Sequence, residues 1–327
     1  MKANALIVLL LISYQMIGQS VFDFMDRPVS TSGAALGGFT VSGSNGDLNN
    51  WLSNPALLDS STVDQFSVSV NPYFVDMARY VVSATLPLAI DQKVSVGLIY
   101  DDYGVFERLD EVGGYLGTFK PRSYSLQSAI NHQSGPFTMG ITLKYSHVRL
   151  DATSASAIHA DLGGTYRSPS SQLVIGMVMS NLGAVVTNSS SGLEQNLPFD
   201  VRLGITFKPT YMPLRFTVTA YGLDDLSQES LPESLKLDRI YSNLFRHMNV
   251  GTELLLGDYF VAILGYNYRI SEALRLPERG FGAGWSFGAS LRLPRFSVSL
   301  ARNTYHTAGG TTFITLQSNY RTIKNLF

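Results

Sequence analysis

Strict alternation of apolar and polar residues constrains the fold of this chain more than any other feature. In FTMGITLKY (137–145), five apolar or aromatic residues alternate with Thr, Gly, Thr and Lys. FSVSV (66–70), VSVGLIY (94–100) and RFSVSL (295–300) follow the same pattern. A period of two is typical of β-strands with one apolar and one polar face.

The alternating segments are numerous and long. Most cover about ten residues, which is the length that a tilted strand needs to cross a bilayer, whereas strands of soluble domains usually have about five or six. We count fourteen of them, and they begin near residues 65, 79, 92, 121, 136, 153, 171, 199, 213, 246, 258, 281, 295 and 310.

The connections between these segments fall into two classes. Every second one is tight: AIDQ, HQSG, RSPS, KPTYM, GD and LP. The others include four long polar stretches, namely 104–120, 182–198, 224–245 and 269–280. One end with short turns and one with long loops is typical of outer-membrane barrels. With an even number of strands, we expect both chain ends on the periplasmic side and the long loops outside the cell.

Low charge supports the same fold. Charged residues make up 15% of the chain, against about 25% in ordinary soluble domains. Strands that span a membrane must satisfy their backbone groups internally, so the sheet has to close. We therefore predict an all-β protein, a 14-stranded antiparallel transmembrane β-barrel over 65–327, with Glu253 facing the lumen. The net charge of −1 argues against nucleic acid as a partner.

The first residues carry a targeting signal. Met1-Lys2 is followed by an apolar run, ALIVLLLISYQMI, and by the small and polar residues GQS. This order is typical of a secretory signal peptide, and the run is shorter than the roughly 20 residues of a membrane-spanning helix. We expect residues 1–20 to be removed. The chain has no Cys, so no disulfide is expected.

Residues 21–64 do not alternate. They are rich in Gly, Ser and Asn, with a short helical pattern at Leu48, Trp51 and Leu52 after a possible N-cap at Asp47. We expect this segment to be an N-terminal hatch that plugs the barrel, because its large apolar side chains suit burial. The alternative is a flexible periplasmic leader.

Catalytic and metal-binding patterns are weak. GWSFG (284–288) matches the G-x-S-x-G motif of serine hydrolases, but that chemistry needs a strand-to-helix turn, and here the alternation continues past Ser286. We predict no catalytic residue, cofactor or metal site. Acidic pairs at Asp101-Asp102, Asp110-Glu111 and Asp224-Asp225 could hold Ca²⁺, but without convergent spacing solvated loops are the preferred interpretation.

The hatch region carries a family resemblance. AALGG (34–38) followed by NPALL (54–58) resembles the hatch of FadL-like outer-membrane barrels, which have fourteen strands. VFDF (21–24) and YDDYGVFERLDEVGGYLGTF (100–119) extend the resemblance to the PorQ family of the type IX secretion system. The resemblance assigns these residues to the hatch motif: Gly37, Gly38, Trp51, Asn54 and Pro55.

Membership of that family implies a role in surface attachment of secreted proteins. PorQ-like barrels are thought to lie in the outer membrane of Gram-negative bacteria of the Bacteroidota type. Through their outer loops they would hold a PorZ-like surface protein, near PorU-like and PorV-like members of the complex that joins cargo to lipopolysaccharide. The loop residues expected to contact a partner are Phe106, Arg108, Tyr115, Leu193, Leu226 and Leu235.

Two further hypotheses concern lipids. As an alternative to a scaffold, the protein could be a FadL-like channel for uptake of hydrophobic small molecules, for which a kink in the third strand near 98–104 would be the structural sign. Outer-membrane lipid and lipopolysaccharide are the expected surroundings, and Arg108, Lys120 and Arg122 could meet lipopolysaccharide phosphates.

Overall fold

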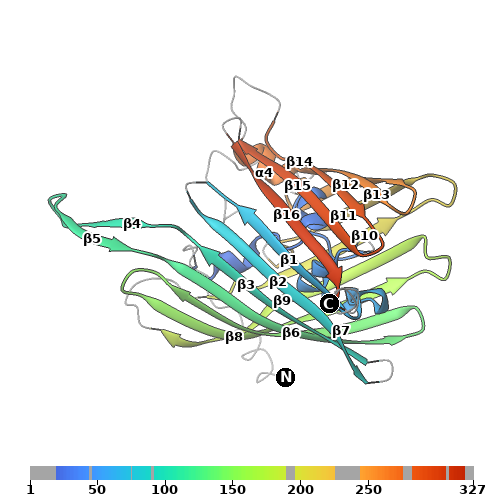
Figure 1. The fold of residues 1–327 in the computed structure, drawn as a ribbon, viewed down its shortest axis with the longest axis horizontal. Coiled ribbons are helices and arrows are strands. Elements are labelled where there is room, and N and C mark those ends of the chain that lie inside the picture. The colour runs from blue at the N-terminus through green and yellow to red at the C-terminus, as the bar shows by residue number, and fades with distance from the viewer. Residues whose placement is uncertain are drawn as a thin grey trace, which may run out of the picture.

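The structure, a computed structural model, describes residues 20–43, 46–74, 76–89, 92–188, 196–224, 244–274, 282–306 and 309–320. Fourteen strands form one closed barrel in which neighbours are antiparallel and the first strand pairs with the last (Figure 1). These strands are β1 (Gln65–Pro72), β2 (Ala78–Ala89), β3 (Gln92–Asp102), β6 (Arg122–Ser134), β7 (Phe137–Arg149), β8 (Ser154–Arg167), β9 (Leu173–Asn188), β10 (Asp200–Phe207), β11 (Leu214–Ala220), β12 (Met248–Leu256), β13 (Phe260–Asn267), β14 (Trp285–Arg292), β15 (Phe296–His306) and β16 (Gly309–Asn319).

The barrel confirms the fourteen strands expected from the alternation, and their starts agree closely. The largest difference is at β14, which begins at Trp285 rather than near residue 281. The tight connections gather at one end of the barrel and the long ones at the other, because consecutive strands run up and down. We call these the short-turn end and the long-connection end.

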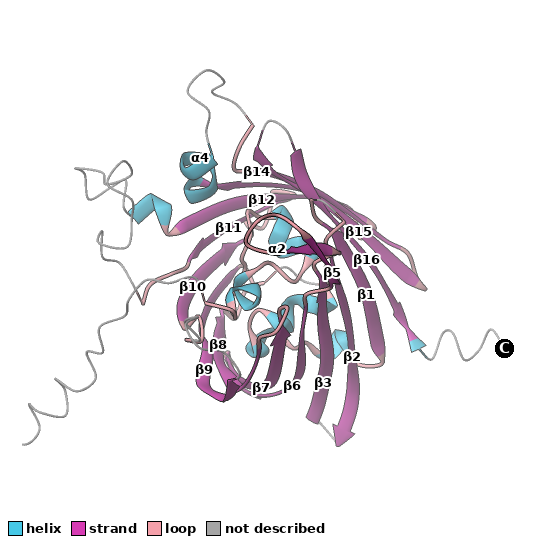
Figure 2. Ribbon diagram, turned by 90° about the vertical axis from the view of Figure 1, so that its left-hand side faces the viewer, coloured by secondary structure: helices cyan, strands magenta, loops and turns pink. Residues whose placement is uncertain are grey.

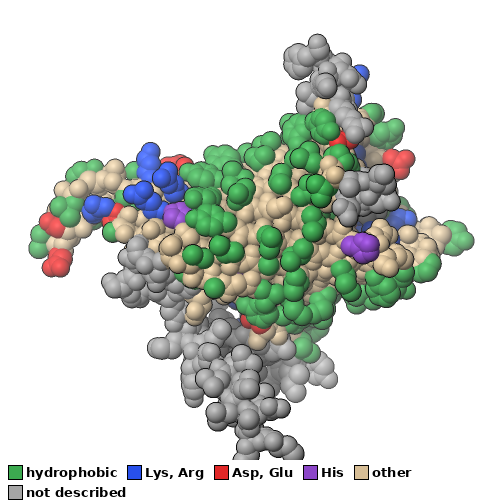
Figure 3. Space-filling view, turned by 90° about the horizontal axis from the view of Figure 1, so that it is seen from below, with side chains coloured by type: hydrophobic (Ala, Val, Ile, Leu, Met, Phe, Trp, Pro, Cys, Tyr) green, Lys and Arg blue, Asp and Glu red, His purple; other side chains and the backbone are tan. Residues whose placement is uncertain are grey.

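Alternation separates the two faces of the wall. On β1, Ser67 is fully buried toward the lumen, whereas the neighbouring Val68 is 42% exposed on the outside. Glu253 is buried in the lumen as expected, where it pairs with Arg215 at 3.1 Å. Hydrophobic side chains cover much of the outer surface (Figure 3).

The outer face of β6 and β7 shows the depth of the apolar band. Near the long-connection end, Tyr124 is paired with His147, and ten residues further along β6 Ser134 is paired with Phe137. The rings of Phe137 and Tyr166 lie 5.2 Å apart there. At about 3.3 Å per residue and a tilt of about 40°, these two rows are roughly 25 Å apart along the barrel axis, which matches the apolar band of outer-membrane barrels.

The described parts of the N-terminal segment, residues 20–43 and 46–64, lie inside the ring of strands (Figure 2). The segment enters at the long-connection end, where Phe22 packs with Val148 and Ala155, and it reaches the short-turn end, where Asn131 donates to the Leu58 carbonyl at 2.8 Å. Its helical turns are η1 (Asp23–Asp26), α2 (Thr31–Ala35), η2 (Leu48–Leu52), η3 (Pro55–Leu57) and η4 (Ser60–Thr62). In the part of the chain that the structure describes, no helix is long and apolar enough to span a membrane.

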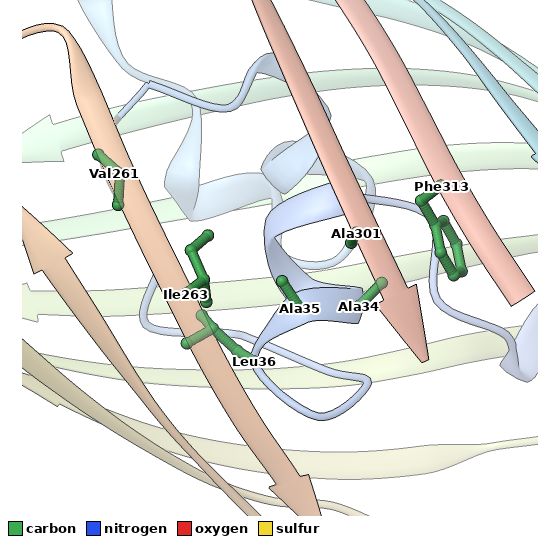
Figure 4. Packing of buried hydrophobic residues seen from close by; sticks show 7 residues of the cluster. All are labelled: Ala34, Ala35, Leu36, Val261, Ile263, Ala301 and Phe313. Carbon is green, nitrogen blue, oxygen red and sulfur yellow. The ribbon is translucent and has the colours of Figure 1, made fainter. Parts of the chain in front are cut away.

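An apolar cluster fixes one side of this segment to the wall. Ala34, Ala35 and Leu36 pack against lumen-facing side chains of β13, β15 and β16 (Figure 4). The wall residues of the cluster are Val261, Ile263, Ala301 and Phe313. These four break the polar pattern of the lumen face at the point where α2 rests.

Connections that were expected to be loops contain regular structure. In the stretch 182–198, β9 continues as far as Asn188. Residues 104–120 hold a hairpin of β4 (Phe106–Leu109) and β5 (Tyr115–Phe119), which projects far beyond the barrel (Figure 1). The stretch after β13 begins with α4 (Tyr268–Leu274). The hairpin extends β3 and β6 after a break at Gly104, whose φ of 83° is in the left-handed region.

Within β3 itself the kink considered for residues 98–104 is absent, and the chain breaks only after the strand has ended, at Gly104. From Leu98 to Asp102, β3 keeps one continuous register with both β2 and β6. The alternation breaks because apolar Ile99 points inward, where it packs in one cluster with Trp51, and polar Asp102 lies on the outward face, so the strand continues without a bulge.

Candidate functional site

Two glycines form the turn after α2, and this turn contacts β12 and β13. Gly37 and Gly38 have φ values of 102° and 133°, which L side chains rarely adopt. Asn267 donates to the Gly37 carbonyl at 2.9 Å, and Asn249 donates to the carbonyls of Leu36 and Phe39 at 2.8 and 2.9 Å. The AALGG motif is therefore a turn whose carbonyl groups bind amide side chains of β12 and β13.

Asn54 and Pro55 attach the other side of the segment. Asn54 is fully buried, and its side chain accepts from Ala56 N at 3.0 Å and donates to the Val41 carbonyl at 2.7 Å. The Pro55 backbone lies against β7, where a Cβ on Gly140 would be 2.7 Å from the Pro55 carbonyl carbon. The NPALL motif thus fits a part of the wall that has no side chain.

Trp51 is buried with 1% of its surface exposed. Its cluster includes Val81, Ile99 and Ala129 of β2, β3 and β6. The structure therefore brings all five hatch-motif residues into the lumen, on different sides of one segment: Gly37, Gly38, Trp51, Asn54 and Pro55.

A buried ion pair that the sequence did not suggest holds the first part of the segment. Arg79 of β2 donates to both Asp101 carboxylate oxygens, at 2.7 and 2.9 Å, and to the Phe24 carbonyl at 2.5 Å. Arg79 and Asp101 are 1% and 2% exposed. The pair of Asp101 with Asp102, considered as a Ca²⁺ site, is split, since only Asp101 faces inward.

Arg27 lies next to that pair, toward the long-connection end. Its guanidinium is over the rings of Tyr73 and Tyr103, 5.4 and 5.9 Å from their centroids. Burial raises the pKa of Tyr73 to about 12, so the phenol stays neutral and the contact is of the cation–π type.

A second charged group lies on β7 to β10. Lys144 pairs with Asp161, and Arg202 pairs with Asp200 and, at 2.5 Å, with Asp26 of the segment. A cavity of about 30 Å³ beside these side chains is large enough for water molecules only. Lys144 lies at an inward position of β7 between Thr142 and Ser146, and this charge on a Ser/Thr-lined face could have indicated the group from the sequence.

The hairpin residues Phe106, Arg108 and Tyr115 lie outside the barrel. Phe106 stacks on Phe119 with ring centroids 5.6 Å apart, and Arg108 forms an ion pair with Asp151 of the β7–β8 connection. Apolar side chains of the hairpin are strongly exposed, including Val112 at 92% and Tyr115 at 64%. The hairpin thus combines ordered strands with an apolar surface that nothing in the described chain covers.

The other candidate residues lie outside the described chain or within a strand of the wall. Leu193, Leu226 and Leu235 lie outside the described residues. Ser286, the second residue of β14, is 3% exposed and paired with Gly265 and Asn303 of the adjacent strands, so the G-x-S-x-G match is a lumen-facing strand residue. Among the described residues, no group of three or more His, Cys, Asp or Glu side chains converges.

A cleft opens on the outer wall near the short-turn end. Pairing between β3 and β6 starts only at Val94 and Ile130, while β6 and β7 continue to Ser134. The cleft below this point has a volume of about 390 Å³. Its lining consists of Leu88, Lys93, Ile130, Asn131, His132, Met139, Gly140 and Ile141.

No family model and no curated protein sequence matches this chain. Among solved structures, the Pseudomonas putida toluene transporter TodX is similar with a TM-score of 0.52 at 14% identity, over 92% of this chain and 98% of that chain. The Ralstonia pickettii toluene transporter TbuX gives a TM-score of 0.49 at 13% identity, over 90% and 99%. A Pseudomonas aeruginosa FadL homologue gives 0.48 at 10%, also over 90% and 99%.

This chain has the fold of the TodX barrel. At 14% identity the similarity shows the fold and nothing finer. A closed 14-stranded barrel with an apolar outer band is an outer-membrane architecture.

Proposed function

We propose that this protein is a non-enzymatic outer-membrane anchor of the type IX secretion attachment complex. In this proposal the N-terminal segment is a fixed hatch, the long-connection end faces outward, and the β4–β5 hairpin holds a PorZ-like surface protein. PorU-like and PorV-like proteins and lipopolysaccharide are the expected neighbours. The observation that carries the proposal is the apolar surface of the projecting hairpin.

The hairpin has the properties of a docking element. Exposed apolar patches on ordered structure mark interaction sites, and the apolar positions here lie on both strands and at the tip: Val105, Phe106, Leu109, Val112, Tyr115 and Leu116. Each strand pairs only with the other in the described sheet. Their outer edges are therefore open to strand addition by a partner.

The filled lumen supports a static role. The segment is held by the Arg79–Asp101 pair, by asparagines of β12 and β13 and by the wall glycines, on several sides at once. The cavity beside Met25, Arg27 and Phe39 of the segment has room for water molecules only. A barrel filled in this way suits an anchor better than an open pore.

Purification from native outer membrane in mild detergent tests the proposal. The variant carries Phe106→Ser, Val112→Ser and Tyr115→Ser, and the matched control carries Glu107→Gln and Thr118→Ala in the same hairpin. We expect the apolar variant to lose a co-purifying surface protein while the control retains it. Equal retention by both variants, with the barrel folded, would contradict the hairpin as the docking element.

A second candidate, uptake of hydrophobic small molecules, is favoured by the TodX-like fold and by the cleft between β3 and β6. The cleft is lined by apolar Leu88, Ile130 and Met139 on the lipid side, and its floor includes Gly140, against which Pro55 rests. A ligand that entered here would have to displace the N-terminal segment to reach the lumen.

A reversible crosslink separates the two candidates. The Thr31 and Thr315 hydroxyl oxygens lie 2.6 Å apart, and the chain has no Cys, so Thr31→Cys with Thr315→Cys would form one disulfide between segment and wall. An anchor keeps its partner in both redox states. A channel would lose transport of a hydrophobic probe when oxidised and regain it on reduction, which would favour uptake.

A further inference from the structure

Two arginines face each other on the outer wall at the long-connection end. Arg122, the first residue of β6, is directly opposite Arg149, the last residue of β7. Both side chains are exposed, and both lie on the outward face, because their neighbours Ser123 and Val148 are buried inside. Lysines and arginines gather where the hairpin leaves the barrel (Figure 3).

This arrangement is electrostatically unfavourable without a counter-charge. Like charges directly opposite one another on a sheet destabilise the pair. Within the described chain no ion pair joins either guanidinium to an acidic side chain. Asp102 lies opposite Arg122 on β3 and brings one negative charge to this row, while one of its oxygens accepts from Gly104 N at 2.9 Å. The two arginines therefore leave an excess of positive charge. The exposed Lys120 adds a third positive charge two residues from Arg122.

The arginine pair is at a defined depth. The next row of outward-facing side chains toward the middle of the barrel consists of Tyr124 and His147, whose rings lie 5.2 Å apart. The ring of Tyr145 lies 6.2 Å from that of Tyr124. Below them the exposed apolar side chains of Leu126, Leu143 and Ile158 begin the apolar band. Rings of this kind prefer the level of lipid headgroups, so the guanidinium groups lie at the level of headgroup phosphates.

We propose that Arg122 and Arg149 form a binding site for the phosphorylated headgroup of lipopolysaccharide. Guanidinium groups bind phosphate in a bidentate manner, and opposed residues on neighbouring strands are about 5 Å apart at Cα. One phosphate can therefore contact both. The apolar rows below would accept the acyl chains of the same molecule.

The outer-leaflet glycolipid is the ligand because of the position of the site. This inference rests on the outward orientation of the long-connection end in the proposed function. It is independent of the hairpin as a docking element, because both arginines lie on the barrel wall. A free phosphate would lack the apolar contacts, and a glycerophospholipid belongs to the opposite leaflet.

The test measures lipopolysaccharide bound to the full-length protein by native mass spectrometry. The variant is Arg122→Gln with Arg149→Gln. The matched control is Arg302→Gln, an exposed arginine on β15 that donates to Thr312 at 2.8 Å. We expect binding to fall about tenfold or more in the double variant, as for loss of a charge-assisted hydrogen bond, and to remain unchanged in the control.

Further probes identify the ligand. Dephosphorylated lipopolysaccharide should bind the wild-type protein as weakly as native lipopolysaccharide binds the double variant, and phosphatidylglycerol should bind more weakly than lipopolysaccharide. Unchanged binding in a folded double variant, an equal loss in Arg302→Gln, or equal binding of either probe would overturn the proposal. Capture of the surface protein, followed in the same preparations, reports separately on the proposed function.

Discussion

The N-terminal segment and the β4–β5 hairpin both lie outside the hydrogen-bonded ladder of the barrel, yet their chemistry is opposite. The segment buries polar side chains, and Asn49 and Asn54 are fully buried. The hairpin exposes apolar ones, with Leu109 and Leu116 at 54% and 60%. In a soluble domain both patterns would be unfavourable.

The difference shows where each region finds its partners. The Asn49 amide oxygen accepts from the hydroxyls of Ser67 and Ser83, each at 2.7 Å, so the barrel itself provides the polar groups that the segment needs. The apolar side chains of the hairpin have no such counterpart in the described chain. The stability of the segment therefore depends on the wall, whereas the hairpin surface depends on another molecule.

The largest expected effect comes from removing the cation that holds the segment. Arg79→Gln leaves the Asp101 carboxylate buried without a counter-charge, and we expect a loss of about 3–5 kcal/mol in the free energy of unfolding. Denaturant unfolding of the refolded barrel measures it. Arg79→Gln with Asp101→Asn should recover much of the loss; a double variant as unstable as the single one would show that the charge is not the cause.

A smaller loss is expected from adding one methyl group to the wall. Gly140→Ala places a Cβ against the Pro55 backbone, and overpacking of this kind costs about 1–3 kcal/mol. Limited proteolysis of the N-terminal segment reports its release. The control is Gly164→Ala, where the nearest atom to the new Cβ is 4.0 Å away; equal proteolysis of the two variants would contradict the close fit.

The sequence predicted the strands of the wall well because successive side chains of a β-strand point to opposite faces, so the pattern of apolar and polar residues depends on local geometry alone. Starts such as Gln65 and Gln92 follow directly from alternation. The inward charges were harder to interpret: Arg79 and Asp101 belong to different strands, and only the register between β2 and β3 brings them together. Pairing of distant strands is a tertiary property, so local patterns could not reveal it.

The strands of the hairpin could not be predicted from the sequence. GVFERLDEVGGYLGTF reads as a polar loop with scattered apolar residues, because its strands β4 and β5 are short and their order depends on being extensions of β3 and β6. The turn at its tip is local, since Asp110 accepts from the backbone of Val112 at 3.0 Å. An Asp followed by two glycines could have indicated this turn.

Within the hairpin, the stacked rings give the next effect. Phe106→Ala removes the contact with Phe119, and aromatic pairs contribute about 0.5–1.5 kcal/mol. Hydrogen exchange of the β4 and β5 amides should become faster, while the barrel amides remain unchanged. Faster exchange in the barrel as well would mean that the stability of the hairpin is not independent of the wall.

The smallest effect concerns the ion pair at the base of the hairpin. Arg108 and Asp151 are 48% and 35% exposed, so water and salt screen their attraction, and we expect Arg108→Gln to weaken hairpin protection by only about 0.2–1 kcal/mol. Asp151→Asn should have the same effect, and the double variant should add nothing, because residues of one pair are not additive. The difference from wild type should also disappear at high salt. Because an exposed pair orients the hairpin without fixing it, a loss as large as that of Arg79→Gln would show that the hairpin is attached as firmly as the segment in the lumen.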